Sequence, residues 1–244
     1  NTRLSKARKI MTAKILVSKE EVIRIISERW SPLSESQRKL LTDNVRIVSF
    51  KKNDIIYRGG ESPRELMCLI LGKIKVYKEG VNGRSQIIRA IKAVDFFGYR
   101  AYFAGEDYKT SAMAIDNCVV AFLPIQLMVK LMHENNAVSM FFIRHLAKLL
   151  GSSDERTVSL TQKHIRGRLA ETLLFLKDSY GVEEDGYTLS IYLSREDIAS
   201  MSNMTTSNAI RTLSSFAMEN IIMIDGRKIR IMQDEELRKV SKLG

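Results

Sequence analysis

The spacing of hydrophobic residues changes at Pro124, and this change constrains the architecture of the chain more than any other feature. From Val45 to about Leu123, apolar and polar residues alternate with a period near two, which is typical of half-buried strands. After Pro124, apolar residues recur every three or four positions, which is typical of amphipathic helices. Only three prolines occur in 244 residues and none of them forms a linker, so the change of period is what divides the chain.

Several short strands are predicted before Pro124, after two short amphipathic helices at residues 19–30 and 34–44 that Pro32 separates. Asn82-Gly83 predicts a tight hairpin turn between two of these strands, because the central residues of such a turn adopt positive φ. The strand-like runs are residues 47–57, 65–79, 84–94 and 110–123. Many short strands at this spacing predict an antiparallel roll or small barrel.

A helix at residues 125–135 and a long helix from about Ala137 to Lys163 are predicted after Pro124. Residues on one face of the long helix recur at alternating steps of three and four, as in the seam of a coiled coil. The seam comprises Ile143, Leu146, Leu150, Ser153, Thr157, Leu160 and His164. A helix within one domain can show the same stripe, but the length of this one favours pairing between two chains.

The C-terminal part has the pattern of a winged helix-turn-helix. An amphipathic helix at 165–181 and a strand at 188–193 precede LSREDIASMSNMTTSNAIRTL, residues 193–213. Ser194 is suited to cap a first helix, and Asn203 to the left-handed turn that follows it. The second helix is predicted to begin near Thr205. Its predicted buried residues are Ala209, Ile210, Leu213 and Phe216, and a hairpin turning at Asp225-Gly226 follows.

The second helix has side chains suited to contact DNA bases. Its outward residues are Thr205, Thr206, Ser207, Asn208 and Arg211. Asparagine pairs with adenine, arginine with guanine, and the threonine methyl group contacts thymine. Contacts with the backbone of DNA are expected from Ser194, Arg195, Arg227 and Lys228, with Arg166, Arg168 and Arg230 as further candidates. A winged helix that contacts another protein instead is the alternative.

The charge distribution gives only weak support to a nucleic-acid partner. The chain has a net charge of +11, but residues 1–60 carry +8, residues 61–164 carry +4 and residues 165–244 carry −1. The basic segment 1–18 is explained as well by a solvated tail. Local placement is therefore more informative than net charge. No acidic residue lies between Met201 and Met218, so nothing there would repel phosphates.

The composition excludes several other classes of protein. No apolar run approaches the ~18 residues of a membrane helix, and the N-terminus lacks the apolar core of a secretory signal, so we expect a cytoplasmic protein without membrane contact. Cys68 and Cys118 are expected to be buried free thiols, which suits a reducing compartment. We find no metal-binding motif and no GxxxxGK or HExxH sequence, and therefore predict that the chain is not an enzyme.

The chain resembles the CRP/FNR family of bacterial transcription regulators over about residues 35–235. The matching stretches are residues 50–91, 94–103, 165–176 and 193–213. The resemblance implies an α+β fold, with an N-terminal antiparallel β-roll (a double-stranded β-helix of the cyclic-nucleotide-binding type), a long dimerisation helix and a C-terminal winged helix. It places these units at 19–135, 136–164 and 165–244. It also implies a homodimer that binds a palindromic site in double-stranded DNA and contacts RNA polymerase.

The sequence departs from this family where cyclic AMP would bind. Members that bind cyclic AMP have Gly-Glu in the phosphate-binding turn and Arg-Ser or Arg-Thr shortly after it. Here Tyr99 follows Gly98, and Thr110-Ser111 replaces the second pair. We therefore expect a signal other than cyclic AMP, or a pocket that Tyr99 and Phe103 fill. The candidate effector-pocket residues are Phe97, Gly98, Tyr99, Arg100, Thr110, Ser111, Ser153 and Asp154.

The other cofactors through which members of this family sense signals, an iron–sulfur cluster and haem, require particular protein ligands. An iron–sulfur cluster needs about four thiolates, and the chain has two cysteines, so no such cluster is expected. Haem stays open as a cofactor because a single axial histidine can suffice, although His133, His145 and His164 all lie in helical segments. The sequence does not identify the small-molecule effector.

The second helix also differs from that of many relatives. They carry Arg-Glu on its first turn, followed by arginine four positions after the glutamate, and contact a TGTGA-like half-site. Thr206-Ser207 replaces the pair, whereas Arg211 keeps the later arginine. We therefore predict one retained guanine contact and a different half-site. The competing hypothesis is a sensing or protein-interaction module of the same fold that does not bind DNA, motivated by the −1 charge of residues 165–244.

Overall fold

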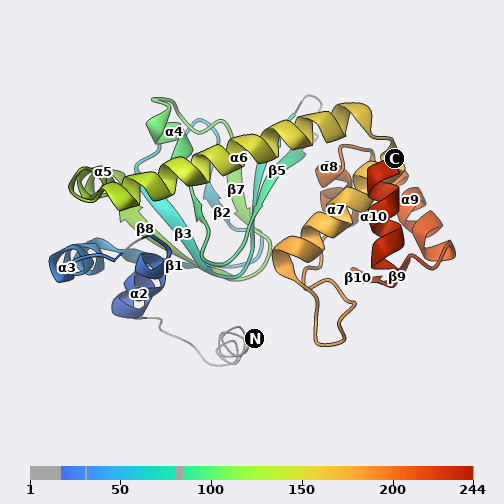
Figure 1. Cartoon of the computed structure of the whole chain (residues 1–244), viewed down its shortest axis with the longest axis horizontal. Helices are drawn as coiled ribbons and strands as arrows, with labels where there is room; N and C mark the ends of the chain where they lie inside the picture. The colour runs from blue at the N-terminus through green and yellow to red at the C-terminus, as the bar shows by residue number, and fades with distance from the viewer. Residues whose placement is uncertain (1–17, 31, 81–84, 244) are drawn as a thin grey trace.

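The computed structural model describes residues 18–30, 32–80 and 85–243, and its architecture is the predicted one. A β-roll is followed by a long helix and by a winged helix-turn-helix, and the long helix runs from the roll to the winged helix (Figure 1). The predicted tail 1–18, except for Ser18, and the Asn82-Gly83 turn lie outside the described residues.

Two antiparallel four-stranded sheets form the roll. One sheet has the order β1 (Arg46–Phe50), β8 (Cys118–Pro124), β3 (Glu65–Leu71) and β6 (Phe96–Phe97). The other has the order β2 (Ile55–Tyr57), β7 (Ser111–Ala114), β4 (Ile74–Glu79) and β5 (Ser85–Ile91). Buried side chains from both sheets, including Leu69, Val76 and Val120, form one core cluster. Alternate residues of strands such as β4 and β8 enter this core because successive side chains of a strand point to opposite faces.

Within the described residues, four helices contribute to a second core cluster, against β3, β6 and β8. They are α2 (Lys19–Trp30), α3 (Glu35–Asn44), α5 (Ile125–Glu134) and the start of α6 (Asn136–Gln162). Helix α2 buries Val22, Ile23, Ile26 and Trp30, a spacing that places them on one helical face. The ring of Trp30 lies 5.4 Å from that of Phe96 and so ties α2 to the sheet.

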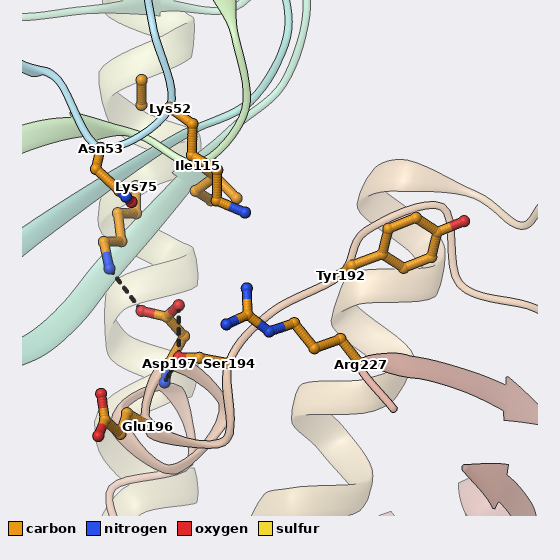
Figure 2. Close-up of a pocket in the computed structure, with 10 residues that line it drawn as sticks. Lys52, Asn53, Lys75, Ile115, Tyr192, Ser194, Glu196, Asp197 and Arg227 are labelled. Carbon is orange, nitrogen blue, oxygen red and sulfur yellow. Dashed lines mark hydrogen bonds and ion pairs between the residues drawn. The ribbon is translucent and has the colours of Figure 1, made fainter. Parts of the chain in front are cut away.

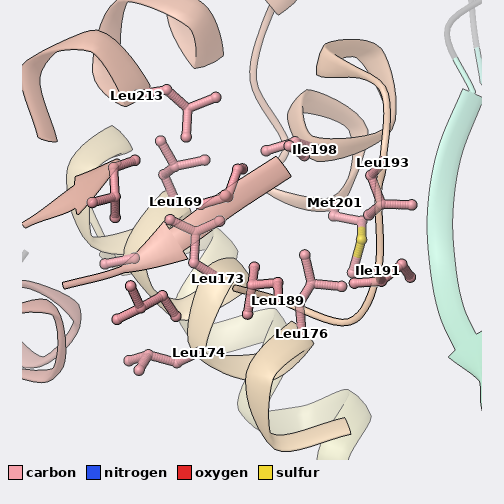
Figure 3. Packing of buried hydrophobic residues seen from close by; sticks show 14 of the residues in the cluster. Leu169, Leu173, Leu174, Leu176, Leu189, Ile191, Leu193, Ile198, Met201 and Leu213 are labelled. Atoms are coloured by element: carbon pink, nitrogen blue, oxygen red, sulfur yellow. The ribbon is translucent and has the colours of Figure 1, made fainter. Parts of the chain in front are cut away.

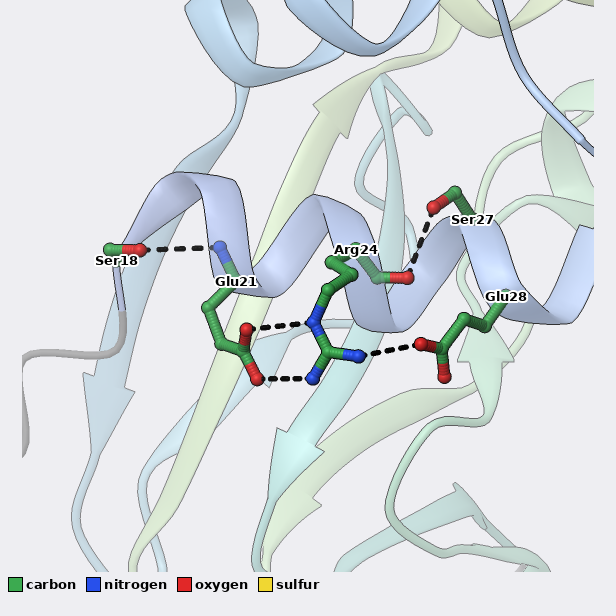
Figure 4. A network of polar contacts seen from close by, with 5 residues as sticks. All are labelled: Ser18, Glu21, Arg24, Ser27 and Glu28. Carbon is green, nitrogen blue, oxygen red and sulfur yellow. Dashed lines mark hydrogen bonds and ion pairs between the residues drawn. The ribbon is translucent and has the colours of Figure 1, made fainter.

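Local polar contacts fix the ends and outer faces of these helices. Ser18 accepts a hydrogen bond from the amide of Glu21, and Arg24 donates to Glu21 and Glu28 on the exposed face of α2 (Figure 4). Ser34 and Gln37 form a reciprocal capping box at the start of α3. The ion pairs of Arg24 stabilise an exposed helix by only ~0.2–0.5 kcal/mol each, and a helix cap contributes about 1 kcal/mol, so the buried faces supply most of the stability.

Helix α6 presents an apolar stripe that no other described residue of the chain covers. Met140, Ile143, Leu150 and Val158 are all exposed large hydrophobic side chains. Of the predicted seam, Ser153 and Thr157 are also exposed, and Leu160 is half-buried. Leu146 is different, because it packs against the chain's own second core cluster. The exposed stripe therefore lies on a different face of α6 from Val138 and Phe142, which are buried in the second core cluster.

The winged helix contains four helices and a two-stranded hairpin. They are α7 (Ile165–Tyr180), α8 (Arg195–Met201), α9 (Thr206–Met218), β9 (Ile222–Asp225), β10 (Lys228–Ile231) and α10 (Asp234–Leu243). The hairpin turns after Asp225, as predicted. The predicted strand at 188–193 is wrong, since only Thr188 and Leu189 form isolated bridges. Its alternation reflects burial of Leu189, Ile191 and Leu193 in the winged-helix core rather than pairing.

Both cysteines are free and buried, as predicted. Cys68 belongs to the second core cluster, which the helices cover, and Cys118 to the core cluster formed by the two sheets. Burial raises the pKa of the Cys118 thiol to about 12, so neither reactivity nor metal ligation is favoured there. Among the described residues, no helix is both long and apolar enough to cross a bilayer.

Two glycines with the same backbone conformation test how tightly the roll is packed. Gly72 has φ +93°, and a Cβ there would lie 2.5 Å from the Asn117 carbonyl oxygen and 2.6 Å from Cys118 Cβ. Gly60 has φ +89°, and a Cβ added to it would have no atom within 4 Å apart from those of its two chain neighbours. Gly60→Ala should lower the free energy of unfolding by about 1–2 kcal/mol through backbone strain, and Gly72→Ala by about 3–5 kcal/mol. Denaturant unfolding measures both, and equal losses would contradict the packing described.

Candidate nucleic-acid interface

Local hydrogen bonds define the helix-turn-helix. The Ser194 hydroxyl accepts from the Asp197 amide at 3.0 Å and caps α8, as predicted. Asn203 forms the predicted left-handed turn, with φ +50°. Thr205 caps α9 by accepting from the Asn208 amide at 3.2 Å. Its hydroxyl is therefore engaged within the helix, although it lies at the end that a DNA-binding helix presents to the major groove.

The buried face of α9 differs from the predicted one at a single position. Ala209, Leu213 and Phe216 are buried, as predicted, but Ile210 is 47% exposed and Thr212 is buried in its place. The hydroxyl of Thr212 donates to the Asn208 carbonyl at 2.9 Å, so its burial leaves no polar group unsatisfied. A face at i, i+3, i+4 and i+7 starting from Ala209 leaves Ile210 on the outside.

The outer face of the first turns of α9 contains hydroxyl groups, an amide and a cation. Ser207 and Arg211 are exposed, and Thr206 and Asn208 are half-buried. Arg211 donates a hydrogen bond to the Asn208 side-chain oxygen at 2.8 Å. This bond holds the guanidinium and the amide side by side, so the two groups suited to guanine and adenine are already oriented relative to one another. Ile210 and Ser214 complete this exposed face, and the sequence did not identify them.

The expected phosphate-binding residues fall into two groups. Arg227 and Lys228 are exposed on the wing. Arg195 instead donates to the Gly226 carbonyl at 2.6 Å, which joins the start of α8 to the wing turn, and desolvation lowers the pKa of its guanidinium. Arg230 donates to the Thr188 hydroxyl at 3.3 Å. The Lys228 ammonium lies 5.9 Å from the centre of the Tyr192 ring. The wing thus offers two exposed cations, Arg227 and Lys228, and Arg195 fixes the position of its tip.

Arg166 holds the far end of α9 in place. It makes a two-pronged pair with Glu219, at 2.8 and 2.7 Å, and also donates to the Ser215 hydroxyl. The hydrogen bonds that Glu219 accepts from Arg166 and from the Ser215 hydroxyl hold its pKa at about 2. The Arg166 guanidinium also lies 4.8 Å from the centre of the Phe216 ring. In this structure Arg166 is engaged inside the winged helix rather than presented to a phosphate.

Arg168 holds the turn between α8 and α9. Its guanidinium donates to the carbonyl oxygens of Ser202, at 3.1 Å, and Asn203, at 3.2 Å. It also reaches the carbonyl oxygens of Leu160 and Lys163, where α6 ends, each at 3.3 Å. One side chain thereby connects the end of the long helix to the turn that orients α9.

Helix α8 docks on the roll through contacts that span more than a hundred residues of sequence. Lys75 on β4 pairs with Asp197 at 2.6 Å, and each side chain is only about one-fifth exposed. Figure 2 shows this pair beside Ser194. The Ser200 hydroxyl accepts from the Ile87 amide at 2.8 Å and donates to the Ser85 carbonyl at 2.7 Å. Both hydrogen bonds extend the edge of strand β5 onto α8.

An apolar cluster and one arginine complete this junction. The winged-helix core around Leu169 and Leu213 (Figure 3) continues onto the roll through Tyr77, Ile87 and Ile115. From α6, Arg156 donates to the carbonyl oxygens of Ile87, Ile88 and Met201, at 2.7, 2.8 and 3.2 Å. Burial lowers the pKa of this guanidinium. No motif in the sequence pointed to these contacts, because their partners are far apart along the chain.

A pocket of about 240 Å³ opens beside the junction, between the roll and the winged helix. Lys52 and Asn53 line it from the roll, and Tyr192 and Arg227 from the winged helix (Figure 2). Arg227 extends from the wing toward the Lys75–Asp197 pair in this view. One of the two wing cations is thus close to the roll in this arrangement.

Aromatic side chains occupy the interior of the roll near the candidate effector residues. The rings of Tyr57 and Tyr108 stack with centroids 4.0 Å apart, and fully buried Phe97 lies 6.4 Å from Tyr57. Burial raises the pKa of the Tyr57 hydroxyl. The Ser111 hydroxyl accepts from the Gly59 amide at 2.9 Å and is therefore engaged within the chain.

The prediction that Tyr99 and Phe103 fill this pocket is wrong. Phe103 is 43% exposed at the end of the short helix α4 (Arg100–Phe103). Tyr99 is buried, but it belongs to the cluster under the helices, and its hydroxyl is 2.7 Å from His145 Nδ1 on α6. Burial lowers the pKa of His145 and raises that of Tyr99, so this is a hydrogen bond between neutral groups. Tyr99 therefore joins the turn after β6 to the long helix.

The remaining candidate effector residues do not converge on one another. A Cβ on Gly98, which has φ +83°, would lie 2.2 Å from Met67 Cε, so the turn is closely packed. Arg100 forms an ion pair with Glu106 at 2.7 Å. Ser153 and Asp154 are exposed on α6. The described residues hold no group of three or more His, Cys, Asp or Glu side chains arranged to bind a metal ion.

Two families of sequences match separate parts of the chain. Residues 47–135 match the cyclic nucleotide-binding domain, and residues 167–240 match the Crp-like helix-turn-helix domain. The first match covers the roll, and the second covers α7 to α10.

Whole proteins with both parts are also similar to this chain. The CRP-like cAMP-activated global transcriptional regulator of Mycobacterium tuberculosis is 24% identical over 200 residues, 82% of this chain and 89% of the relative. The anaerobic regulatory protein of Bacillus subtilis is 25% identical over 177 residues, 72% of this chain and 74% of the relative. The structure of FixK2 from Bradyrhizobium japonicum superposes with a TM-score of 0.73 at 22% identity, covering 80% of this chain and 96% of FixK2.

An arginine that is hydrogen-bonded to backbone carbonyl groups and one that is exposed on the wing should respond differently to substitution. Arg168→Met removes the charged donor to the Ser202 and Asn203 carbonyls and should lower the free energy of unfolding by about 2–3 kcal/mol. Arg227→Met removes an exposed cation and should change it by less than about 0.5 kcal/mol. Denaturant unfolding compares the two variants. A larger loss for Arg227→Met than for Arg168→Met would contradict this assignment.

Proposed function

The chain belongs to the CRP/FNR family of transcription regulators, and on this premise we propose that it is a homodimer that recognises a palindromic DNA sequence. DNA binding through the Crp-like helix-turn-helix is the function of this family, whose members are regulators and not enzymes. The observation that carries the proposal is the outer face of α9. It is free of acidic residues and exposes Ser207 and Arg211 at the end of the helix that enters a major groove.

The exposed stripe of α6 supports the homodimer. Met140, Ile143, Leu150 and Val158 are apolar and uncovered, and they lie at steps that recur along one side of a helix. Pairing α6 with its copy removes these side chains from water. Two-fold symmetry then places two α9 helices in successive major grooves, about 34 Å apart on one face of the duplex. We accordingly assign residues 19–135 to sensing, 136–164 to dimerisation and 165–244 to DNA binding.

A signal other than cyclic AMP fits the roll best. Tyr99 and Thr110 stand where binding of that nucleotide would require glutamate and arginine, and the Tyr99 hydroxyl is already engaged by His145. Tyr57, Phe97 and Tyr108 occupy the interior of the roll. The relative from Mycobacterium tuberculosis is described as cAMP-activated, so the two proteins would differ in their signal. Contact with RNA polymerase and a place in the cytoplasm follow from the regulatory role proposed here.

Arg211→Ala tests DNA recognition, with Arg38→Ala as its control. Both substitutions remove one exposed positive charge, but Arg38 lies on α3, outside the winged helix. On an operator selected from random duplexes, Arg211→Ala should weaken binding about 10- to 100-fold and Arg38→Ala less than about twofold. Fluorescence anisotropy at two salt concentrations measures both.

The selected operator is itself informative. Since Thr206-Ser207 replaces the family's Arg-Glu pair, the half-site should contain one guanine contacted by Arg211 and should differ from TGTGA. Recovery of TGTGA palindromes would contradict this assignment. Failure of the wild-type protein to retain any duplex at low salt would instead favour a module of this fold that does not bind DNA.

Leu150→Asp tests the dimer, with Lys148→Asp as its control. Leu150 is 65% exposed on the apolar stripe, whereas Lys148 is exposed about 200° away around the helix axis. Burying a carboxylate in the seam should raise the dissociation constant of the dimer at least ~100-fold, and Lys148→Asp should leave it nearly unchanged. Sedimentation velocity distinguishes the species. A monomeric wild-type protein, or a Leu150→Asp variant as dimeric as the wild type, would refute the seam.

A further inference from the structure

The exposed face of α9 contains one apolar side chain among polar ones. Ile210 is 47% exposed, and its neighbours one helical turn away, Ser207 and Ser214, are also exposed. Arg211 follows it directly. Met218 is the other exposed large hydrophobic residue of the helix, at its last position and more than two turns from Ile210. Ile210 therefore lies in the same patch as the polar residues proposed to contact bases.

Neither helix formation nor packing within the chain accounts for isoleucine at this position. A β-branched residue loses side-chain freedom in a helix, and alanine or lysine would form the helix better. The core of the winged helix is completed by Ala209, Thr212, Leu213 and Phe216, which leave Ile210 outside it. A single exposed apolar residue is common on protein surfaces. What distinguishes Ile210 is its place beside Arg211 on a face without carboxylates.

The chemistry of the major groove offers a partner for such a side chain. The base edges there present hydrogen-bond donors and acceptors, and one apolar group, the C5-methyl of thymine. The four exposed residues from Ser207 to Ser214 span about 10 Å along the helix, roughly three base-pair steps. Ile210 and Arg211 are adjacent, so their contacts fall on the same or neighbouring base pairs.

We propose that Ile210 is a specificity-determining residue that packs against the C5-methyl group of a thymine next to the guanine contacted by Arg211. The proposal rests on the function proposed above and adds a second base to it. The contact is hydrophobic and independent of salt, unlike the contacts of Arg227 and Lys228 with phosphates. It adds discrimination for the thymine methyl group, which hydrogen bonds from Asn208 and Arg211 do not probe.

Replacing thymine by deoxyuridine removes only the methyl group and so tests this contact. Each thymine in one half-site of the selected operator is replaced in turn, and binding is measured for wild type, Ile210→Ala, Ile210→Val and Met218→Ala. For wild type, one replacement within one base pair of the guanine should weaken binding about fourfold, the value of one buried methyl group. Met218→Ala should show the same loss, Ile210→Val a reduced loss, and Ile210→Ala none.

The outcomes separate this proposal from the function on which it rests. If the protein binds the operator and Ile210→Ala is as sensitive to every replacement as the wild type, Ile210 makes no methyl contact and the proposal is overturned. A selected half-site without thymine within one base pair of the guanine overturns it as well. If no duplex is retained by the wild type, the DNA-binding function itself fails. Circular dichroism of Ile210→Ala should match the wild type, since the position is exposed.

Discussion

The guanidinium of Arg156 is the interaction on which the arrangement of the molecule most depends. It donates to carbonyl oxygens of Ile87 and Ile88 on the roll and of Met201 at the end of α8, while its own backbone belongs to α6. A charge that is largely buried needs several acceptors to offset its desolvation, and here carbonyl groups from two other elements supply them. The three units of the fold are thereby joined at one side chain.

Two chains of contacts connect the roll to α9. One passes through the docking of α8 on the roll, where Lys75 pairs with Asp197 and the apolar cluster crosses between the units. The other passes from Tyr99 through His145 to α6, and from the end of α6 through Arg168 to the turn before α9. We propose that a ligand or partner that favours one arrangement of α6 over another would also change the placement of α9 through these contacts.

Much of the fold was predictable because its determinants are local. The change of period at Pro124, the cap at Ser194 and the left-handed turn at Asn203 are properties of short segments, and the structure has all three. The error at Ile210 concerns which side of a helix faces the core, and Leu146, which also packs partly on the chain's own core, shows the same dependence. Which side is buried depends on contacts with elements that are distant in the sequence. The sequence predicts that Arg166 and Arg195 contact DNA phosphates. In the structure Arg166 pairs with Glu219 and Arg195 donates to the Gly226 carbonyl, partners that only the folded chain brings near.

Native mass spectrometry of the full chain with a duplex carrying the selected palindrome tests the central claim most directly, because it counts chains and duplexes in one complex. The claim is that two copies pair through α6 and bind one duplex through their α9 helices. The account predicts one dominant species of two chains and one duplex, with two chains in the absence of DNA. Single chains that bind no duplex, or a complex of one chain with one duplex, would contradict it.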